Sequence, residues 1–205
     1  MTLREYIDRL RGRTVAIIGI GVSNTPLLRL LLREGISVTA CDRSSREKLG
    51  ALAGELEAAG AKLQLGDGYL QNLSQDVIFR TPGLRPDVPE LEAARAKGST
   101  ITSEMEVFFE VCPCPIIAVT GSDGKTTTTT IIAQLLRAAG HTVHVGGNIG
   151  HPLLAEADTI RPTDWAVLEL SSFQLMTMTH SPHIAVVTNL APNHLDVHKI
   201  GRAHV

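Results

Sequence analysis

The strongest chemical signal in the sequence is a glycine-rich stretch that ends in lysine and threonine. Residues 118–127 read Ala-Val-Thr-Gly-Ser-Asp-Gly-Lys-Thr-Thr and lie between an apolar run and a helical pattern. Backbone amides in such a turn, together with a helix N-terminus, can surround phosphate oxygens. Lys125 would reach the β and γ phosphates, and the Thr126 hydroxyl would ligate magnesium. The stretch therefore predicts a nucleotide-phosphate site made of Thr120, Gly121, Ser122, Asp123, Gly124, Lys125, Thr126 and Thr127.

The match to the general phosphate-loop pattern is incomplete. That pattern has a glycine five residues before Gly124, where this chain has Val119. The alternative interpretation is a tight strand-to-helix turn with an incidental lysine. Position and residue type both favour phosphate binding.

Two further side chains could complete such a site. Glu169 interrupts the apolar run of residues 165–170, where an unpaired carboxylate would be costly to bury. Magnesium is a suitable partner, because it prefers oxygen ligands and often takes only one or two carboxylates from the protein. A structural salt bridge to an arginine or lysine is the alternative. His194 follows another expected strand, at the rim where open α/β sheets bind ligands, although a single loop histidine is usually only solvated.

A second glycine pattern lies near the start of the chain. Gly19 and Gly21 follow an apolar run, Asn24 stands where a dinucleotide fingerprint has its third glycine, and Asp42 has the spacing of a ribose-binding carboxylate. A nicotinamide-dependent dehydrogenase is therefore an alternative. Asp42 could equally be an ordinary helix N-cap. The phosphate loop that follows argues against a dehydrogenase.

The elements expected to position these residues alternate between strand and helix. In the first half we expect strands at residues 14–19, 37–41, 76–80 and 100–102, and helices at 27–33, 45–59 and 88–97. In the second half we expect strands at 116–120, 142–145, 165–170 and 184–189, and a helix at 125–139. This rhythm predicts an α/β protein, with a Rossmann-like nucleotide-binding domain over residues 1–103 and an incomplete phosphate-loop domain over 104–199.

Composition excludes several classes of function. A net charge of −2 and a pI near 6.4 give no basic field for nucleic acid or an anionic membrane. The three cysteines lack the spacing of a zinc ribbon or a Cys-x-x-Cys pair, which indicates reduced thiols and a cytoplasmic protein. The first residues contain no apolar signal core, and no apolar run approaches a membrane span.

The form of the phosphate loop resembles one family in particular. Thr-Gly-x-x-Gly-Lys-Thr-Thr is similar to the loop of the Mur ligases and the folylpolyglutamate synthases, with Asp123 where asparagine is usual. Residues 146–150 (Gly-Gly-Asn-Ile-Gly), 168–175 (Leu-Glu-Leu-Ser-Ser-Phe-Gln-Leu) and 193–196 (Asn-His-Leu-Asp) resemble motifs of the D-glutamate-adding Mur ligases. The resemblance extends over residues 3–199 and identifies a Mur ligase central domain after the Rossmann-like one. A complete nucleotide-type domain ahead of the loop disfavours a folylpolyglutamate synthase.

The resemblance implies roles for individual residues. Catalysis would involve Lys125, His194 and Asn148, and the metal Mg²⁺ would be held by Thr126, Glu169 and His194. The uridine-nucleotide substrate would contact Val22, Ser23, Asp42, Arg43, Thr81, Pro82, Gly83, Asn148, Ser171 and Gln174. Without the resemblance, the last three would be assigned to a glycine-rich turn and a helix cap.

The implied reaction is ATP-dependent ligation in peptidoglycan synthesis. ATP would phosphorylate the carboxylate of UDP-N-acetylmuramoyl-L-alanine, and the amine of D-glutamate would attack the acyl phosphate. We expect a monomer that binds neither nucleic acid nor membrane. The chain lacks the rest of the central sheet, a modified lysine and the third domain of the family, so we expect little ligase turnover from it alone. A non-catalytic nucleotide-binding module remains the third alternative.

The last six residues are expected to be non-native. Residues 200–205 (Ile-Gly-Arg-Ala-His-Val) begin no recognisable helix or strand. Their back-translation, ATC GGA AGA GCA CAC GTC, matches a widely used sequencing adapter. The natural gene is therefore expected to continue beyond about Lys199.

Overall fold

The structure, a computed structural model, describes residues 1–192 of the chain. It divides into two compact units, one formed by Met1–Cys112 and Leu154–Thr159, the other by Pro113–Leu153 and the residues from Ile160 onward. The first unit thus continues past the expected boundary at residue 103, because helix α6 (Glu104–Val111) belongs to it. The η2 segment (Leu154–Thr159) joins the same unit, where the Leu154 amide donates to Glu104 Oε1 at 2.9 Å.

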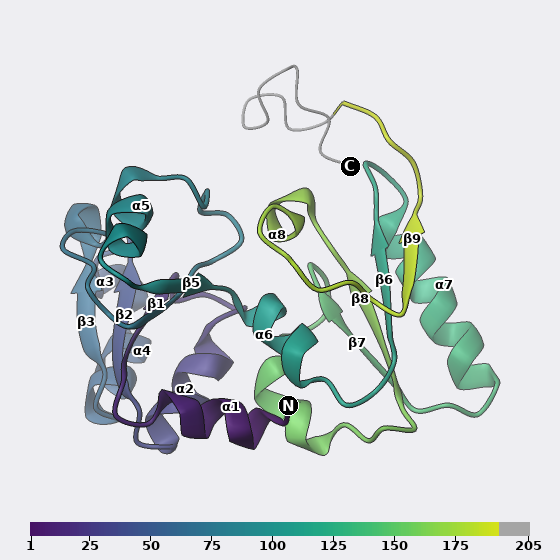
Figure 1. The fold of residues 1–205 in the computed structure, drawn as a ribbon, viewed down its shortest axis with the longest axis horizontal. Helices are drawn as coiled ribbons and strands as arrows, with labels where there is room; N and C mark the ends of the chain where they lie inside the picture. The colour runs from purple at the N-terminus through teal and green to yellow at the C-terminus, as the bar shows by residue number, and fades with distance from the viewer. Residues whose placement is uncertain (193–205) are drawn as a thin grey trace. The chain divides into compact units, whose positions relative to one another are not determined.

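The first unit is built on a five-stranded parallel sheet in the order β3-β2-β1-β4-β5 (Figure 1). Its strands are β1 (Thr14–Ile18), β2 (Ser37–Asp42), β3 (Lys62–Leu65), β4 (Val77–Phe79) and β5 (Thr100–Thr102). The chain grows outward from β1 to β3, then returns to the other side of β1 with β4. This reversal is the topological switch point of Rossmann-like sheets, where ligands bind beyond the carboxyl ends of the strands. The expected α/β class is confirmed.

Short helices precede and connect these strands. They are α1 (Leu3–Leu10), α2 (Thr25–Arg33), α3 (Arg46–Leu49), α4 (Ala51–Ala58), the η1 turn (Gly66–Gly68) and α5 (Pro89–Ala96). The prediction of a single helix over residues 45–59 is wrong. At Gly50 the backbone leaves the helical region (φ 57°, ψ −131°), so α3 ends and α4 begins there.

Both faces of this sheet are covered. Ala16 and Ile18 of β1 pack in one cluster with Ile78 of β4 and Leu91 of α5. Residues at alternate positions of a strand point to the opposite face, and Ile17 there is also fully buried. Burial on both sides explains why β1 reads as a continuous apolar run, the pattern of a central parallel strand.

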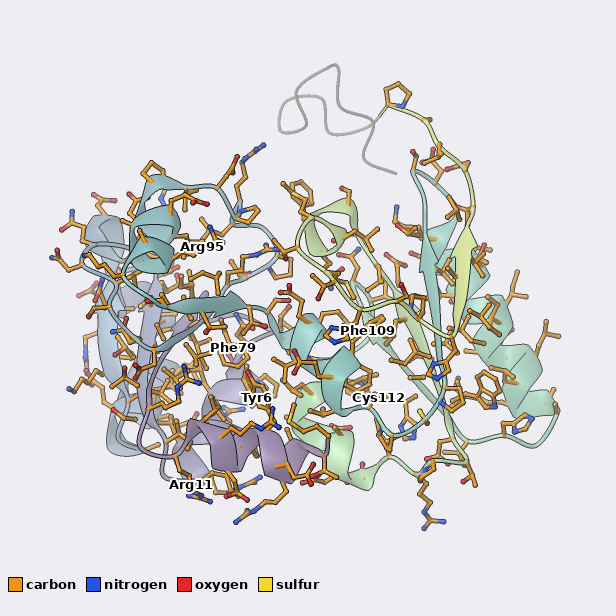
Figure 2. All side chains as sticks on the ribbon, viewed as in Figure 1. Tyr6, Arg11, Phe79, Arg95, Phe109 and Cys112 are labelled. Carbon is orange, nitrogen blue, oxygen red and sulfur yellow. The ribbon has the colours of Figure 1, made fainter. Side chains whose placement is uncertain are left out.

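Helix α1 was not anticipated from the sequence, although its signals are local. Thr2 and Glu5 form a capping box, in which the Glu5 amide donates to Thr2 Oγ1 and the Thr2 amide donates to Glu5 Oε2. Leu3, Ile7 and Leu10 form the buried stripe of the helix. Figure 2 shows Tyr6 of this helix beside Phe79, edge to face with ring centroids 6.4 Å apart. Burial raises the pKa of the Tyr6 phenol.

The second unit contains a four-stranded parallel sheet in the order β7-β8-β6-β9 (Figure 1). Its strands are β6 (Ile116–Thr120), β7 (Val143–Gly147), β8 (Trp165–Glu169) and β9 (Ile184–Val187), and its helices are α7 (Lys125–Ala138) and α8 (Ser172–Leu175). All four strands and α7 lie where the sequence predicted them, within two residues. Helix α7 packs on β6, β7 and β8, and Ala133 of the helix shares a buried cluster with Val143 and Val167.

A close contact between His144 and Asp164, next to the start of β8, makes the stability of this unit depend on pH. His144 Nε2 lies 3.0 Å from Asp164 Oδ2, which also accepts from the Arg161 amide. His144 first, then the Arg161 amide, lowers the pKa of Asp164 from its ordinary value of 3.8. A carboxyl group with a lowered folded-state pKa stabilises the protein above its unfolded-state pKa and loses this effect as pH falls through the folded-state pKa.

Asp164→Asn is therefore expected to destabilise the protein at pH 7 and progressively less below pH 3.8. Denaturant unfolding of the wild type and the variant between pH 7 and pH 3 measures the difference. Asp158→Asn, at an exposed carboxylate, is the control and should show no such trend. A difference that stays constant into acid would contradict the assignment.

Candidate functional site

The phosphate loop connects β6 to α7. Strand β6 ends at Thr120 and α7 begins at Lys125, with Gly124 at the N-cap in the left-handed region (φ 78°). No side chain among residues 1–192 caps this helix. The first N–H groups of a helix have no intrahelical partner, so those of α7 are available to an anion at the loop. Local structure and sequence pattern agree here.

Lys125 lies over the loop that precedes it. Its Nζ donates to the carbonyl oxygens of Gly121, at 2.7 Å, and Ser122, at 2.9 Å. The ammonium group is thereby held at the loop, between backbone carbonyls that are weaker partners than phosphate oxygens. The Lys125 ammonium group would therefore already be positioned beside a bound triphosphate.

Glu169 contacts two of the other predicted residues. It ends β8, in register with Val119 of the adjacent β6, and is only 2% exposed. Its Oε2 accepts from Thr126 Oγ1 at 2.7 Å and its Oε1 accepts from Asn148 Nδ2 at 2.9 Å. Both oxygens accept from neutral groups, so the alternative of a structural salt bridge finds no support within residues 1–192.

The Thr126 hydroxyl and the Glu169 carboxylate also suit a magnesium ion. They supply hard oxygen donors beside the phosphate loop, and Mg²⁺ in nucleotide sites usually takes one or two protein ligands and fills the rest with phosphate and water. Residues 1–192 contain no cluster of three or more His, Cys, Asp or Glu side chains that could hold a metal by themselves. The donors present therefore fit an ion shared with a nucleotide. His194, the third predicted ligand, lies outside the described residues.

Ser171 and Gln174 cap the short helix α8. The Gln174 amide donates to Ser171 Oγ at 3.3 Å, and the Ser171 amide donates to Gln174 Oε1 at 2.9 Å. Gln174 is 5% exposed. Their observed contacts are those of a capping box, and substrate contact stays a prediction.

In the first unit, two of the predicted substrate segments follow strands that end at the switch point. Gly19 follows β1 and Thr81 follows β4, and a Cβ added to Gly19 would lie 2.9 Å from Thr81 Cβ. With φ at 93°, Gly19 also has a backbone conformation that favours glycine. The loop carrying Val22 and Ser23, both exposed, starts from the same point. The turn at residues 81–83 and this loop therefore lie at one end of the sheet.

Asp42 fixes the loop that follows β1. Its Oδ2 accepts from the Ile20 amide at 2.6 Å and its Oδ1 accepts from the Ser44 amide at 2.7 Å. The alternative of a helix N-cap at Asp42 is wrong, because Ser45 caps α3 by accepting from the Lys48 amide. Asp42 thus ends β2 with its carboxylate at the switch point, followed by the exposed Arg43.

Two residues to which the sequence analysis gave no structural role shape this end of the sheet. Arg80, 1% exposed, donates through Nη1 to the Leu84 carbonyl at 3.0 Å and so anchors the turn at residues 81–83. Burial lowers the pKa of its guanidinium group. Asn24, equally buried, donates through Nδ2 to the Ile18 carbonyl at 2.9 Å. The signal for Arg80 was a charge directly after the apolar run Val-Ile-Phe, the same signal that singled out Glu169.

Within residues 1–192, no helix combines the length and the apolar character needed to cross a membrane.

Comparison with known proteins identifies relatives across nearly the whole chain. Residues 119–203 match the Mur ligase middle domain. The chain is 53% identical over 198 residues to a UDP-N-acetylmuramoylalanine–D-glutamate ligase of Acetivibrio thermocellus, covering 96% of this chain and 42% of the relative. A protein of the same name from Clostridium novyi is 51% identical over 199 residues, covering 97% of this chain and 43% of the relative. The chain thus spans less than half the length of these relatives.

Solved structures agree on the fold. A UDP-N-acetylmuramate:L-alanyl-gamma-D-glutamyl-meso-diaminopimelate ligase from Neisseria meningitides superposes with a TM-score of 0.51 at 22% identity, covering 90% of this chain and 63% of that one. A UDP-N-acetylmuramate-alanine ligase from Thermotoga maritima gives 0.50 at 22% identity, covering 90% and 43%. The relatives that are about half identical to this chain, together with the middle-domain match, argue against the dehydrogenase interpretation. The chain belongs to the Mur ligase family.

Proposed function

We propose that the protein containing this chain is an ATP-dependent ligase that adds D-glutamate to UDP-N-acetylmuramoyl-L-alanine during peptidoglycan synthesis. The observation that carries the proposal is the contact of Glu169 with Thr126 and Asn148 beside the phosphate loop. The names of the relatives, which are about half identical to this chain, supply the substrates.

The chemistry requires activation of a poor electrophile. A carboxylate oxygen of the UDP-linked alanine attacks the γ-phosphorus of ATP, and the bond to ADP breaks. The amine of D-glutamate then attacks the carbonyl carbon of the acyl phosphate. Inorganic phosphate leaves, the nitrogen loses a proton, and an amide is formed.

The residues of the second unit have defined tasks in this proposal. Lys125 neutralises charge on the β and γ phosphates, and the first amides of α7 orient them. Thr126 and Glu169 would hold Mg²⁺, which supplies further neutralisation of the phosphoryl oxygens. Asn148 donates to Oε1 of Glu169 and so orients the carboxylate, while Oε2 of Glu169 accepts from Thr126. His194 is proposed to position metal or substrate, as the resemblance implies.

The first unit is proposed to bind the uridine nucleotide. The candidate groups lie at the switch point of its sheet, in the segments of Val22, Ser23, Asp42, Arg43, Thr81, Pro82 and Gly83. Asp42 already accepts from two backbone amides, so its proposed role is to shape the loop as well as to meet the ligand. We further propose a monomer that works in the cytoplasm, and an acceptor site for D-glutamate formed by parts that this chain lacks.

Calorimetric titration of the 205-residue chain tests the substrate assignment. UDP-N-acetylmuramoyl-L-alanine is expected to bind, while NADH is expected not to bind. A uridine diphosphate offers the anionic and ribose groups that this site is proposed to contact, and it needs no nicotinamide pocket. Circular dichroism checks that the chain is folded. Binding of NADH alone would reject the proposal. Ligase turnover by the chain alone is expected to be absent or very low.

A further inference from the structure

The segment after β9 forms one wall of the phosphate loop. It consists of residues 188–191 (Thr-Asn-Leu-Ala), which we name the loop clamp. Its first residue continues the pairing of β9 with β6, because the Thr188 amide donates to the Thr120 carbonyl at 2.9 Å. The clamp then runs beside the loop rather than away from it.

Asn189 holds two amides of the phosphate loop. The Asp123 amide donates to Asn189 Oδ1 at 3.0 Å, and the Ser122 amide donates to the Asn189 carbonyl at 3.3 Å. Phosphate loops bind their ligand through amides that point into the cradle. In this chain two of the loop amides are directed at Asn189 instead. The binding of phosphate is therefore left to Lys125 and the amides in the first turn of α7.

Hydroxyl groups complete the clamp. Thr188 Oγ1 donates to the Asp123 carbonyl at 2.6 Å, and Ser122 Oγ donates to the Ala191 carbonyl at 2.6 Å while accepting from the Ala191 amide at 2.8 Å. The approach is close enough that a Cβ on Gly121 would lie 2.1 Å from Thr188 Oγ1. Gly121 is also at φ 136°, so this position needs glycine for both reasons.

We propose that Asn189 is a positioning residue for nucleotide phosphates, which it orients by fixing the backbone of Ser122 and Asp123. This inference rests on the proposed function, because it assumes that the loop binds a nucleotide. The side chain of Asn189 acts through Asp123 and need not touch the nucleotide. Without its oxygen, the Asp123 amide is released and the loop gains alternative conformations, of which only some present Lys125 and the α7 amides correctly.

Asn189→Leu in the 205-residue chain removes this acceptor and keeps the number and branching of the side-chain heavy atoms. We expect magnesium ADP to bind about tenfold more weakly, which is the upper end of what the loss of one intramolecular hydrogen bond costs. Exchange of the Asp123 amide with solvent should accelerate about tenfold in the nucleotide-free chain. Binding of UDP-N-acetylmuramoyl-L-alanine should not change. Fluorescence titration and amide exchange followed by NMR measure these effects.

Two other variants separate positioning from general destabilisation. Asn189→Asp keeps an acceptor in the same place and should preserve slow exchange at Asp123. Gln134→Leu makes the same kind of change on the exposed face of α7 and should leave binding and exchange as in the wild type. If Asn189→Leu does not fold, Thr188→Val tests the same clamp, because it removes the donor to the Asp123 carbonyl.

The outcomes are distinct. Unchanged ADP affinity and a protected Asp123 amide in Asn189→Leu would overturn the inference. A wild-type chain that binds no nucleotide would instead count against the proposed function. The exchange comparison would still decide whether Asn189 holds the loop.

Discussion

Replacing Lys125 by alanine is expected to weaken nucleotide binding about a hundredfold, since each charge-assisted hydrogen bond to phosphate contributes roughly 1.5–3 kcal/mol. In the structure Nζ contacts only backbone carbonyls of the loop, Gly121 O and Ser122 O, within the described residues. Phosphate oxygens are stronger partners for an ammonium group than these carbonyls are. Titration with a fluorescent ADP analogue in excess magnesium measures the change.

The matched control for this experiment is Lys97→Ala. It removes an equal charge at an exposed position outside the phosphate loop and should bind ADP as the wild type does. Thermal unfolding of Lys125→Ala shows whether the variant is folded. A folded Lys125→Ala chain that binds ADP within about threefold of wild type would have lost only roughly 0.6 kcal/mol, well below the roughly 1.5–3 kcal/mol expected for one charge-assisted hydrogen bond. That result would mean that the loop is an ordinary strand-to-helix turn.

Glu169→Gln is expected to abolish the dependence of nucleotide binding on magnesium. In the wild type, magnesium should raise the affinity for ADP at least about tenfold, because the metal would link phosphate to the Glu169 carboxylate in the proposed site. The glutamine keeps the shape of the side chain. Its oxygen can accept from Asn148 Nδ2 while its amide donates to Thr126 Oγ1, so the buried hydrogen bonds are retained without the charge.

Affinities measured with and without magnesium give the test. In Glu169→Gln the two values should be similar, and both should lie near the metal-free value of the wild type. Glu90→Gln, at an exposed carboxylate on α5, should keep the full magnesium effect. If Glu169→Gln also keeps it, Glu169 has a structural role and the metal is held elsewhere.

Much of the second unit could be predicted from the sequence because its signals are local. The dihedral angles required at Gly121 and Gly124 and the apolar run of β6 depend on a few consecutive residues. In the first unit, β3 was missed because it has four residues of which none is fully buried, so its apolar pattern is weak. The break at Gly50 was missed because the helical pattern continues on both sides of it.

The sequence by itself singled out the groups that we propose to carry the chemistry: a lysine and a threonine at the start of a helix, and a carboxylate at the end of a buried strand. Only the tertiary structure decided that they meet. Glu169 is 43 residues from Thr126 and 21 from Asn148, and Asn189 is 66 from Asp123, yet each pair is hydrogen-bonded. The physical reason is the order of the parallel sheet, in which β8 and β9 flank β6 although β7 follows it in the chain. The spacing of these residues along the chain does not reveal the order of the strands in the sheet.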